Sequence, residues 1–453
     1  MRVAIIGGGA AGLATAWLLQ QDHEVHVFEA DPEPGGHART AMVEHQGAVV
    51  QVETGFRYFF EATYPKLMAL MALLGLELSE RESRISLTRA GMPHVLSLPP
   101  TTPSQLLQLC RRPSDLRHLA LLRRFMTTGD DVVERADWSL SLREYLAARG
   151  FPERFGRELL YPMVAASWGA PLSIMPDFPA YSVLKVMRLT DGRGKFLELE
   201  GGISTYIRAL VDRLGAARLH LGRPIRSVAR DGDALAVTAA DGERLRFDKV
   251  VLATPAIVAQ ALLADDPALA DWRARRRPFD HFEADICIHG DPSWMPRRRA
   301  DWADLNHFHE PDRAWMTEWL GLEAGVEVFR TWLPKGAPVP DRLWHRCHFQ
   351  HLVVTKDNLR LQQDIAAAQG QDGLFAVGMY AVDVDNHESA VGSAMPVAEA
   401  LAPGSATLAA WRQAVAERRA PPRTSRPGPR SAASVQRPTG PPSAMTERTD
   451  TFL

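Results

Sequence analysis

The sequence predicts an α/β fold in which a Rossmann-like domain, built on a βαβ unit, is interleaved with an α+β second domain. A glycine-rich turn at residues 7–12 joins a strand-like run to a helical one. The 453 residues exceed what one ordinary hydrophobic core uses, so two domains are expected. A long helical block then interrupts the chain before strand-like segments return near its end.

The first thirty residues have the size and order of one βαβ unit. Val3 to Ile6 is a short β-branched and apolar run, which predicts a strand. Ala10 to Gln20 contains helix-forming residues with apolar side chains at helical spacing. His23 to Glu29 alternates apolar and polar residues, which predicts a second strand.

The later elements follow from the same periodicities. Helices are expected at 64–78, throughout the proline-punctuated block 99–187, at 204–214 and at 388–401. A β-meander with Asp-Gly turns is expected over 219–252, and short strands over 279–334 and 374–377. The Rossmann-like domain should comprise residues 1–80, 196–270 and 346–417. The second domain should comprise a helical part at 81–195 and a further part at 271–345. Residues 418–453 are expected to form a disordered tail.

Composition excludes several classes of function. The formal net charge is -2, so no global field attracts nucleic acid. The three cysteines show no C-x-x-C spacing, which predicts neither a metal site nor a disulfide framework and fits a reducing cytoplasm. No run of 18 apolar residues is present, so no segment is expected to span a bilayer, whereas the arginines of the tail leave a peripheral membrane contact open.

The glycine-rich turn matches G-x-G-x-x-G. Gly7 permits a tight turn, Gly9 lets the backbone approach a pyrophosphate, and Gly12 allows close packing of helix on strand. The phosphates would lie at the helix N-terminus, where amides and the helix dipole favour negative charge. Glu29 ends the second strand, where its carboxylate can accept hydrogen bonds from a ribose.

A second glycine pair, Gly35-Gly36, follows closely within Pro34–Thr40, a segment that an ordinary NAD domain does not need. Together with the first motif it resembles the flavin-containing amine oxidase superfamily, which includes monoamine and polyamine oxidases, phytoene desaturases and protoporphyrinogen oxidase. The resemblance is strongest to a bacterial branch described as predicted NAD/FAD-binding proteins. It continues through residues 52–56, 201–202, 250–255, 289–291 with 295–296, and 378–390.

The resemblance implies bound FAD. It places the backbone of Thr54 and Gly55 at the isoalloxazine, Ile225 at the adenine, and the backbone N–H of His387 at the flavin N1–C2=O edge. The residues expected to bind the cofactor are Gly7, Gly9, Ala10, Ala11, Gly12, Glu29, Ala30, Gly35, Gly36, His37, Thr54, Gly55, Ile225, Ala253, Gly378, Met379 and His387.

The chain departs from the family pattern at two of these positions. His37 stands where many members have an arginine, and Met379 where many have an acidic residue. The cysteine that anchors flavin covalently in monoamine oxidases has no equivalent, so the resemblance implies non-covalent FAD.

No catalytic side chain is assigned. Arg57, Asp383, Asp385 and His387 are candidates only because they adjoin flavin-facing segments, and ion pairs or helix caps would explain them equally well. Hydride loss to flavin N5 needs no protein base, so the protein's part can be limited to orientation and exclusion of water.

The implied activity is that of an oxidase, dehydrogenase or desaturase. It would transfer hydride from a C–H bond of an apolar small molecule, a lipid or isoprenoid, to flavin N5. No second G-x-G-x-x-G for NADPH is visible, so oxygen, a quinone and a protein stay open as electron acceptors. A redox-neutral flavin isomerase and a non-catalytic escort related to prenyl-protein chaperones are the alternatives.

Overall fold

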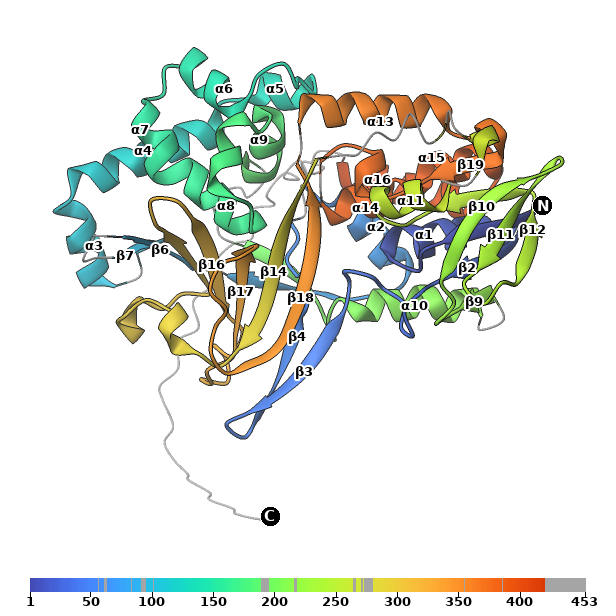
Figure 1. The fold of residues 1–453 in the computed structure, drawn as a ribbon. Coiled ribbons are helices and arrows are strands. Elements are labelled where there is room, and N and C mark those ends of the chain that lie inside the picture. Colours follow the sequence, from blue (N-terminus) through green and yellow to red (C-terminus); the bar gives the residue numbers. More distant parts are fainter. Residues whose placement is uncertain are drawn as a thin grey trace, which may run out of the picture. The chain divides into compact units, whose positions relative to one another are not determined.

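The computed structural model describes residues 1–55, 57–60, 63–82, 84–90, 95–100, 102–188, 195–215, 218–263, 266–269, 272, 280–353, 355–384 and 386–419. Met1–Arg419 form one compact unit, whose two main sheets and their helices are shown in Figure 1. Ala420–Leu453, which contain most of the expected tail, lie outside the described residues.

A five-stranded parallel sheet carries the glycine-rich turn. Its order is β19 (Leu374–Ala376), β13 (Lys249–Leu252), β1 (Arg2–Ile6), β2 (Glu24–Phe28) and β9 (Leu219–His220). The central strands are nearly continuous apolar runs because helices or strands cover both faces of the sheet. The chain thus contains the predicted α/β arrangement with a parallel βαβ unit.

Helices cover one face of the parallel sheet and a smaller sheet covers the other. The first layer contains α1 (Ala10–Leu19), α2 (Pro65–Leu73), α10 (Ser204–Leu214), α14 (His387–Gly392), α15 (Ala394–Leu401) and α16 (Ala406–Arg419). The second contains the antiparallel strands β10 (Ile225–Asp231), β11 (Ala234–Ala239) and β12 (Arg244–Phe247), with α11 (Ala256–Leu262) and α13 (Lys356–Ala368).

A seven-stranded mixed sheet forms the core of the part of this unit that was expected to be a second domain. Its order is β18 (Leu343–Leu352), β14 (His281–His289), β17 (Phe329–Pro334), β16 (Ala314–Trp319), β15 (Leu305–His309), β6 (Ile85–Arg89) and β7 (Val95–Leu98). Only β15 and β6 pair in parallel among the described strands of this sheet.

Helices gather over one end of this sheet (Figure 1). They are α3 (Pro103–Cys110), α4 (Pro113–Thr127), α5 (Asp130–Glu134), α6 (Leu142–Ala148), α7 (Glu153–Phe155), α8 (Tyr161–Trp168) and α9 (Ala180–Arg188). A shared core, which includes Phe125, Phe155 and Leu184, joins these helices to the sheet.

Two strand pairs complete the described part of the chain. β3 (Thr40–His45) and β4 (Ala48–Glu53) form a hairpin, and β5 (Leu78–Glu82) pairs with β8 (Lys195–Leu199). The second pair joins segments on either side of the helical block.

Two predicted elements are corrected by the structure. The expected meander at 219–252 contains only three antiparallel strands, because β9 and β13 at its ends belong to the parallel sheet. The helix expected at 64–78 ends at Leu73, because Gly75 adopts a left-handed φ of 74° and β5 follows. The part expected to be helical, 81–195, also contains β6 and β7, and the seven-stranded sheet continues past residue 345 to Leu352.

Candidate functional site

A cavity of about 390 Å³ lies at the carboxyl ends of the parallel strands. The residues that follow β1, β2, β13 and β19 all line it, and open α/β sheets bind ligands at this edge. Its far wall contains His281, Gln350 and Leu352 from β14 and β18. The cavity therefore reaches from the parallel sheet to the seven-stranded sheet.

The cavity brings together most of the residues expected to bind a cofactor. Those that line it are Gly7, Gly9, Ala10, Ala11, Glu29, Ala30, Gly35, Gly36, His37, Ile225, Ala253, Gly378, Met379 and His387. Gly12, Thr54 and Gly55 do not line it.

The three motif glycines differ in what a side chain would meet. A Cβ on Gly7, whose φ is 114°, would lie 2.6 Å from the Ala253 carbonyl oxygen, and one on Gly12 would lie 2.0 Å from the Gly7 carbonyl oxygen. A Cβ on Gly9 would meet no protein atom closer than 4.0 Å. Gly7 and Gly12 are thus required by packing, whereas Gly9 leaves room for a ligand beside the backbone.

Glu29 is fixed by two backbone amides. Its carboxylate accepts hydrogen bonds from the Gly8 N–H at 2.7 Å and from the Asp31 N–H at 2.9 Å. A carboxylate has about four acceptor sites, so this fixed group can still accept from a ribose. The neighbouring helix α1 has no side-chain cap and no acidic residue in its first turn, which suits a phosphate there.

His387 begins α14 at the opposite end of the cavity and is buried. Its Nε2 forms a hydrogen bond with the Tyr206 hydroxyl. Burial, with a smaller effect of nearby His37, lowers the pKa of His387 to about 3. The imidazole is therefore neutral at physiological pH and cannot act there as a proton donor in its imidazolium form.

Thr54 and Gly55 lie against the backbone of the second glycine segment. The Thr54 N–H donates to the Arg39 carbonyl at 2.9 Å, and a Cβ on Gly55 would lie 2.3 Å from the His37 carbonyl oxygen. Arg330, which is 2% exposed, donates to the carbonyls of Glu53 and Gly55 at 2.6 and 2.9 Å. Arg330, which was not among the predicted site residues, thus holds the segment from Glu53 to Gly55 in place behind the cavity wall.

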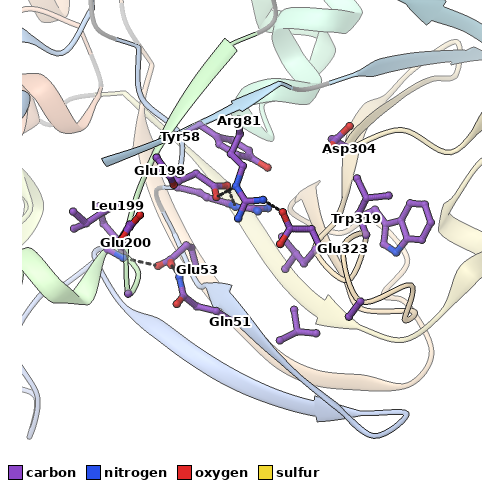
Figure 2. A pocket seen from close by; sticks show the side chains of 18 of the residues that line it. Gln51, Glu53, Tyr58, Arg81, Glu198, Leu199, Glu200, Asp304, Trp319 and Glu323 are labelled. Atoms are coloured by element: carbon purple, nitrogen blue, oxygen red, sulfur yellow. Dashed lines mark hydrogen bonds and ion pairs between the residues drawn. The ribbon is translucent and has the colours of Figure 1, made fainter. Parts of the chain in front are cut away.

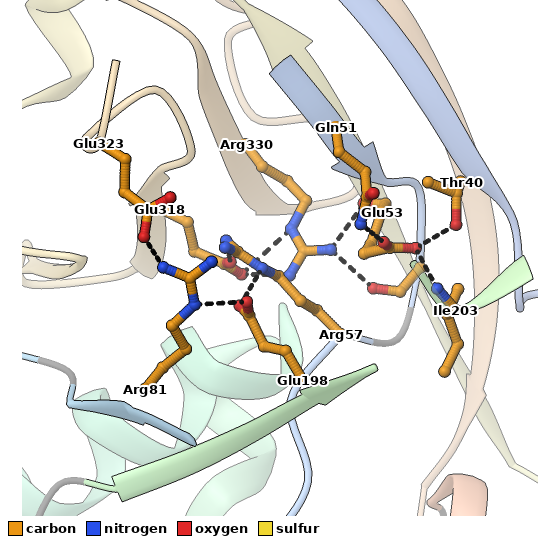
Figure 3. A network of polar contacts seen from close by, with 11 residues as sticks. Thr40, Gln51, Glu53, Arg57, Arg81, Glu198, Ile203, Glu318, Glu323 and Arg330 are labelled. Carbon is orange, nitrogen blue, oxygen red and sulfur yellow. Dashed lines mark hydrogen bonds and ion pairs between the residues drawn. The ribbon is translucent and has the colours of Figure 1, made fainter. Parts of the chain in front are cut away.

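Arg57 belongs to a buried ion-pair network (Figure 3). Its guanidinium lies 2.8 Å from Glu198 and 3.3 Å from Glu318. Burial alone would lower the pKa of Arg57, but Tyr58 and the two carboxylates outweigh it and raise the pKa. Arg57 therefore stays charged, and the ion-pair explanation accounts for its position.

A second cavity of about 790 Å³ adjoins this network (Figure 2). Of the described residues, none lines both cavities. The second cavity is lined by the carboxylates of Glu53, Glu80, Glu198, Glu200, Asp304 and Glu323 and by only two guanidinium groups, those of Arg57 and Arg81. This excess of negative charge disfavours an anionic pyrophosphate. The smaller cavity is therefore the better cofactor site, although the second is larger.

Asp383 also has a structural partner. Its carboxylate pairs with the Lys185 ammonium of α9 and accepts a hydrogen bond from the Tyr181 hydroxyl at 3.0 Å. Neither partner lines the smaller cavity. Asp385, the remaining candidate, lies outside the described residues.

Sequence reasoning missed part of the cavity wall. Thr254 and Pro255 follow Ala253 directly and could have been found from the strand that ends beside them. His281, Gln350 and Leu352 could not, because their place depends on the pairing of β14 with β18 across many residues.

A parallel sheet with this glycine turn and a cavity at its carboxyl edge defines a protein of the nucleotide-cofactor-binding α/β class. The chain belongs to the flavin-containing amine oxidoreductase family, because residues 10–283 match the family described as Flavin containing amine oxidoreductase. It is therefore a flavin-dependent oxidoreductase of that family, which agrees with the predicted resemblance.

The names of two curated relatives refer to carotenoids. The chain is 42% identical over 76 residues to the chloroplastic/chromoplastic zeta-carotene desaturase of Zea mays. This stretch covers 17% of this chain and 13% of the relative. It is 27% identical over 302 residues to the carotenoid phi-ring synthase of Streptomyces griseus, covering 60% of this chain and 56% of the relative. The chain thus matches about half or less of the length of these relatives.

Solved structures share the fold over nearly their whole length. The CLA-producing fatty acid isomerase from P. acnes superposes with a TM-score of 0.65 at 16% identity, covering 87% of this chain and 96% of that one. Cyclohexylamine oxidase from Brevibacterium oxydans IH-35A gives a TM-score of 0.61 at 16% identity, covering 89% and 98%. These likenesses establish the architecture, not the substrate.

The described residues lack two further features. No helix in this part of the chain is both long and apolar enough to cross a membrane. In the same residues, no group of three or more His, Cys, Asp or Glu side chains is arranged to hold a metal ion.

Three buried histidines predict a loss of stability in mild acid. Burial lowers the pKa of His289 and His307 to about 4, as it lowers that of His387. The unfolded chain binds these protons below about pH 6.5 and the folded chain does not, so stability is complete above that pH and falls towards pH 4. Each histidine should contribute a slope of about 1.4 kcal/mol per pH unit.

Urea unfolding at pH 7, 6 and 5 measures this slope. His289→Gln removes one titrating group outside the cofactor cavity and should reduce the mean slope between pH 7 and 5 by about 1 kcal/mol per pH unit. An unchanged slope in that variant would show that His289 is not held neutral by burial.

Proposed function

We propose that the chain binds FAD non-covalently and transfers hydride from a C–H bond of an apolar substrate to the flavin. The observation that carries this proposal is the single cavity that contains Glu29, Gly9, Gly36, Met379 and His387 in a continuous lining. That lining joins the Glu29 carboxylate and the N-terminus of α1 to a wall from β14 and β18, and such a cavity at the strand ends supports a dinucleotide site.

The residues present fit FAD in this orientation. The adenine and ribose would lie beside Ile225 and Glu29, and the pyrophosphate beside Gly9 and the first amides of α1. The flavin would lie towards Met379 and His387, whose backbone N–H would face the N1–C2=O edge. When bound, FAD supplies the hydride acceptor.

Aromatic side chains pack behind the far wall of the cavity without lining it. The ring of Phe349 lies 4.5 Å from the ring of His37, and Trp332 stacks on Phe349 at 6.4 Å. His351 stacks on Phe282 at 5.3 Å in the same part of the sheet. The proposal of a lipid or isoprenoid substrate rests instead on the names of both curated relatives, which refer to carotenoids.

The acid–base candidates support a mechanism without a protein base. The pKa of His387 is lowered to about 3, which makes its neutral imidazole a weak base, Arg57 is held by two carboxylates, and Asp383 is paired with Lys185. The side chains described here would therefore orient the substrate and exclude water, and the hydride would leave the C–H bond without a proton transfer to them.

The purified protein should be yellow, and acid or heat should release intact FAD. Glu29→Ala should weaken FAD binding about tenfold or more without abolishing it, because hydrogen bonds from a ribose to a charged acceptor, each about 1.5–3 kcal/mol, are lost while the amides of α1 remain. Absorption spectra and chromatography of the released cofactor measure both. Colourless protein that cannot be reconstituted with FAD would favour a non-catalytic escort.

Anaerobic mixing of the holoprotein with carotenoid, fatty acid and amine pools tests the reaction and its substrate class. An apolar pool should bleach the flavin, and the amine pool should not. A product formed without lasting bleaching would indicate a redox-neutral isomerase. Bleaching by amines alone would contradict the proposed substrate.

A further inference from the structure

Helix α3 turns its apolar stripe towards solvent. Pro103, Leu106, Leu107 and Cys110 recur at the i, i+3, i+4 and i+7 spacing that on a surface helix normally faces the core. Leu106 and Leu107 are instead 53% and 50% exposed, and no residue of α3 is buried. In the described part of the chain, nothing covers this stripe.

The exposure is not that of a poorly formed helix end. Thr102 caps α3 by accepting a hydrogen bond from the Gln105 N–H, and the Gln105 side chain accepts from the Thr102 N–H, which is a capping box. Leu109, on another side of the helix, packs against the core of the second domain. The stripe therefore points outward on a helix that is fixed from the other side.

The adjoining surface is basic. Arg111 and Arg112 follow α3 directly, and α4 adds Arg117 and Arg123 together with Leu116, which is 43% exposed. Among the described residues, these four arginines form no ion pair. The one carboxylate between residues 102 and 127, Asp115, is buried and bonded to Arg89 at 3.1 Å.

We propose that this α3–α4 surface, defined by Leu106, Leu107 and Leu116 with the four arginines, docks on anionic phospholipid bilayers. The leucines would enter the interface between headgroups and acyl chains, and the arginines would contact lipid phosphates. The positive charge selects an anionic surface. Protein interfaces depend mostly on Tyr, Trp and Arg anchors, and residues 102–127 contain neither Tyr nor Trp.

Figure 1 shows α3 and α4 at the outer edge of the helical group, where a flat surface could reach them. The contact is peripheral and separate from the cofactor cavity, so the proposal does not depend on the function proposed above. A bilayer contact at the second domain would bring an apolar substrate near the enzyme that uses it.

Vesicle sedimentation of the full-length protein tests the proposal. Wild type should bind phosphatidylcholine vesicles containing a quarter phosphatidylglycerol at least tenfold more tightly than pure phosphatidylcholine vesicles. Arg111→Glu/Arg117→Glu should reduce binding to the anionic vesicles about tenfold or more. Leu106→Ser/Leu107→Ser should remove the part of the binding that resists 0.5 M NaCl.

Matched controls carry the same changes elsewhere. Met42→Ser/Leu343→Ser alters two other exposed apolar side chains, and Arg298→Glu/Arg360→Glu reverses two other exposed charges. Both should bind like wild type, and circular dichroism should match in all variants. Equal binding to both kinds of vesicle, or unchanged binding of the α3–α4 variants, would overturn the proposal. So would light scattering that shows a dimer which Leu106→Ser/Leu107→Ser dissociates.

Discussion

Gly9→Asp is expected to give a folded protein that has lost its flavin. Gly9 caps α1 in an extended conformation, with φ -78° and ψ -177°, which aspartate adopts readily. Aspartate is also a better N-cap than glycine, so the apoprotein should be at least as stable. Its carboxylate would enter the space reserved for the pyrophosphate. The repulsion between this carboxylate and the negatively charged pyrophosphate should lower FAD affinity roughly a hundredfold or more.

The ratio of flavin to protein absorbance after purification, with thermal unfolding of the apoprotein, measures this prediction. Gly404→Asp is the matched control, because a Cβ there meets no atom within 4 Å and Gly404 does not line the cavity. Gly12→Ala should behave differently and lower stability itself, since its Cβ would lie 2.0 Å from the Gly7 carbonyl oxygen. Full flavin content in a soluble Gly9→Asp protein would rule out this loop as the phosphate site.

The parts of the fold that could be predicted are those with a local signal. The turn at Gly7, the packing at Gly12 and the carboxylate at Glu29 lie within thirty residues, and the structure brings them to one sheet edge. The strand β19 was also predicted correctly, because its apolar run is too short for a helix and fits a buried strand.

The remaining parts of the fold could not be predicted, because they depend on pairing between strands that are far apart in the sequence. The apolar alternation near β9 and β13 is the same whether a strand joins a hairpin or a parallel sheet, so the sequence predicted a meander too long at both ends. β18, which supplies Gln350 and Leu352 to the cavity, is half exposed and rich in histidine, so it has no strong strand pattern. The helical spacing in α3 predicted the helix correctly but not that its apolar stripe would face outward.

The Arg330–Glu318 pair should be among the most sensitive points of the fold. The two side chains are 2% and 1% exposed, and the guanidinium donates to Glu318 at 2.6 Å as well as to the carbonyls of Glu53 and Gly55 (Figure 3). Arg330→Met would leave Glu318 with Arg57 at 3.3 Å as its other charged partner and two buried carbonyls without their donor. Removing one partner of a buried pair should lower the free energy of unfolding by about 3–5 kcal/mol.

Two further variants separate the charge from the packing. Arg330→Met/Glu318→Gln removes the stranded carboxylate, so it should recover part of the stability lost in Arg330→Met, and the difference in urea unfolding gives the electrostatic share. Arg412→Met breaks a pair with Glu399 in which both side chains are about half exposed, and it should lower stability by less than about 1 kcal/mol. If Arg330→Met and Arg412→Met lose equal stability, the buried pair contributes no more than a surface one. The segment from Glu53 to Gly55 must then be held by its other contacts, which are the β3–β4 ladder, the Glu53 bonds to Thr40 and Ile203, and the Thr54–Arg39 hydrogen bond.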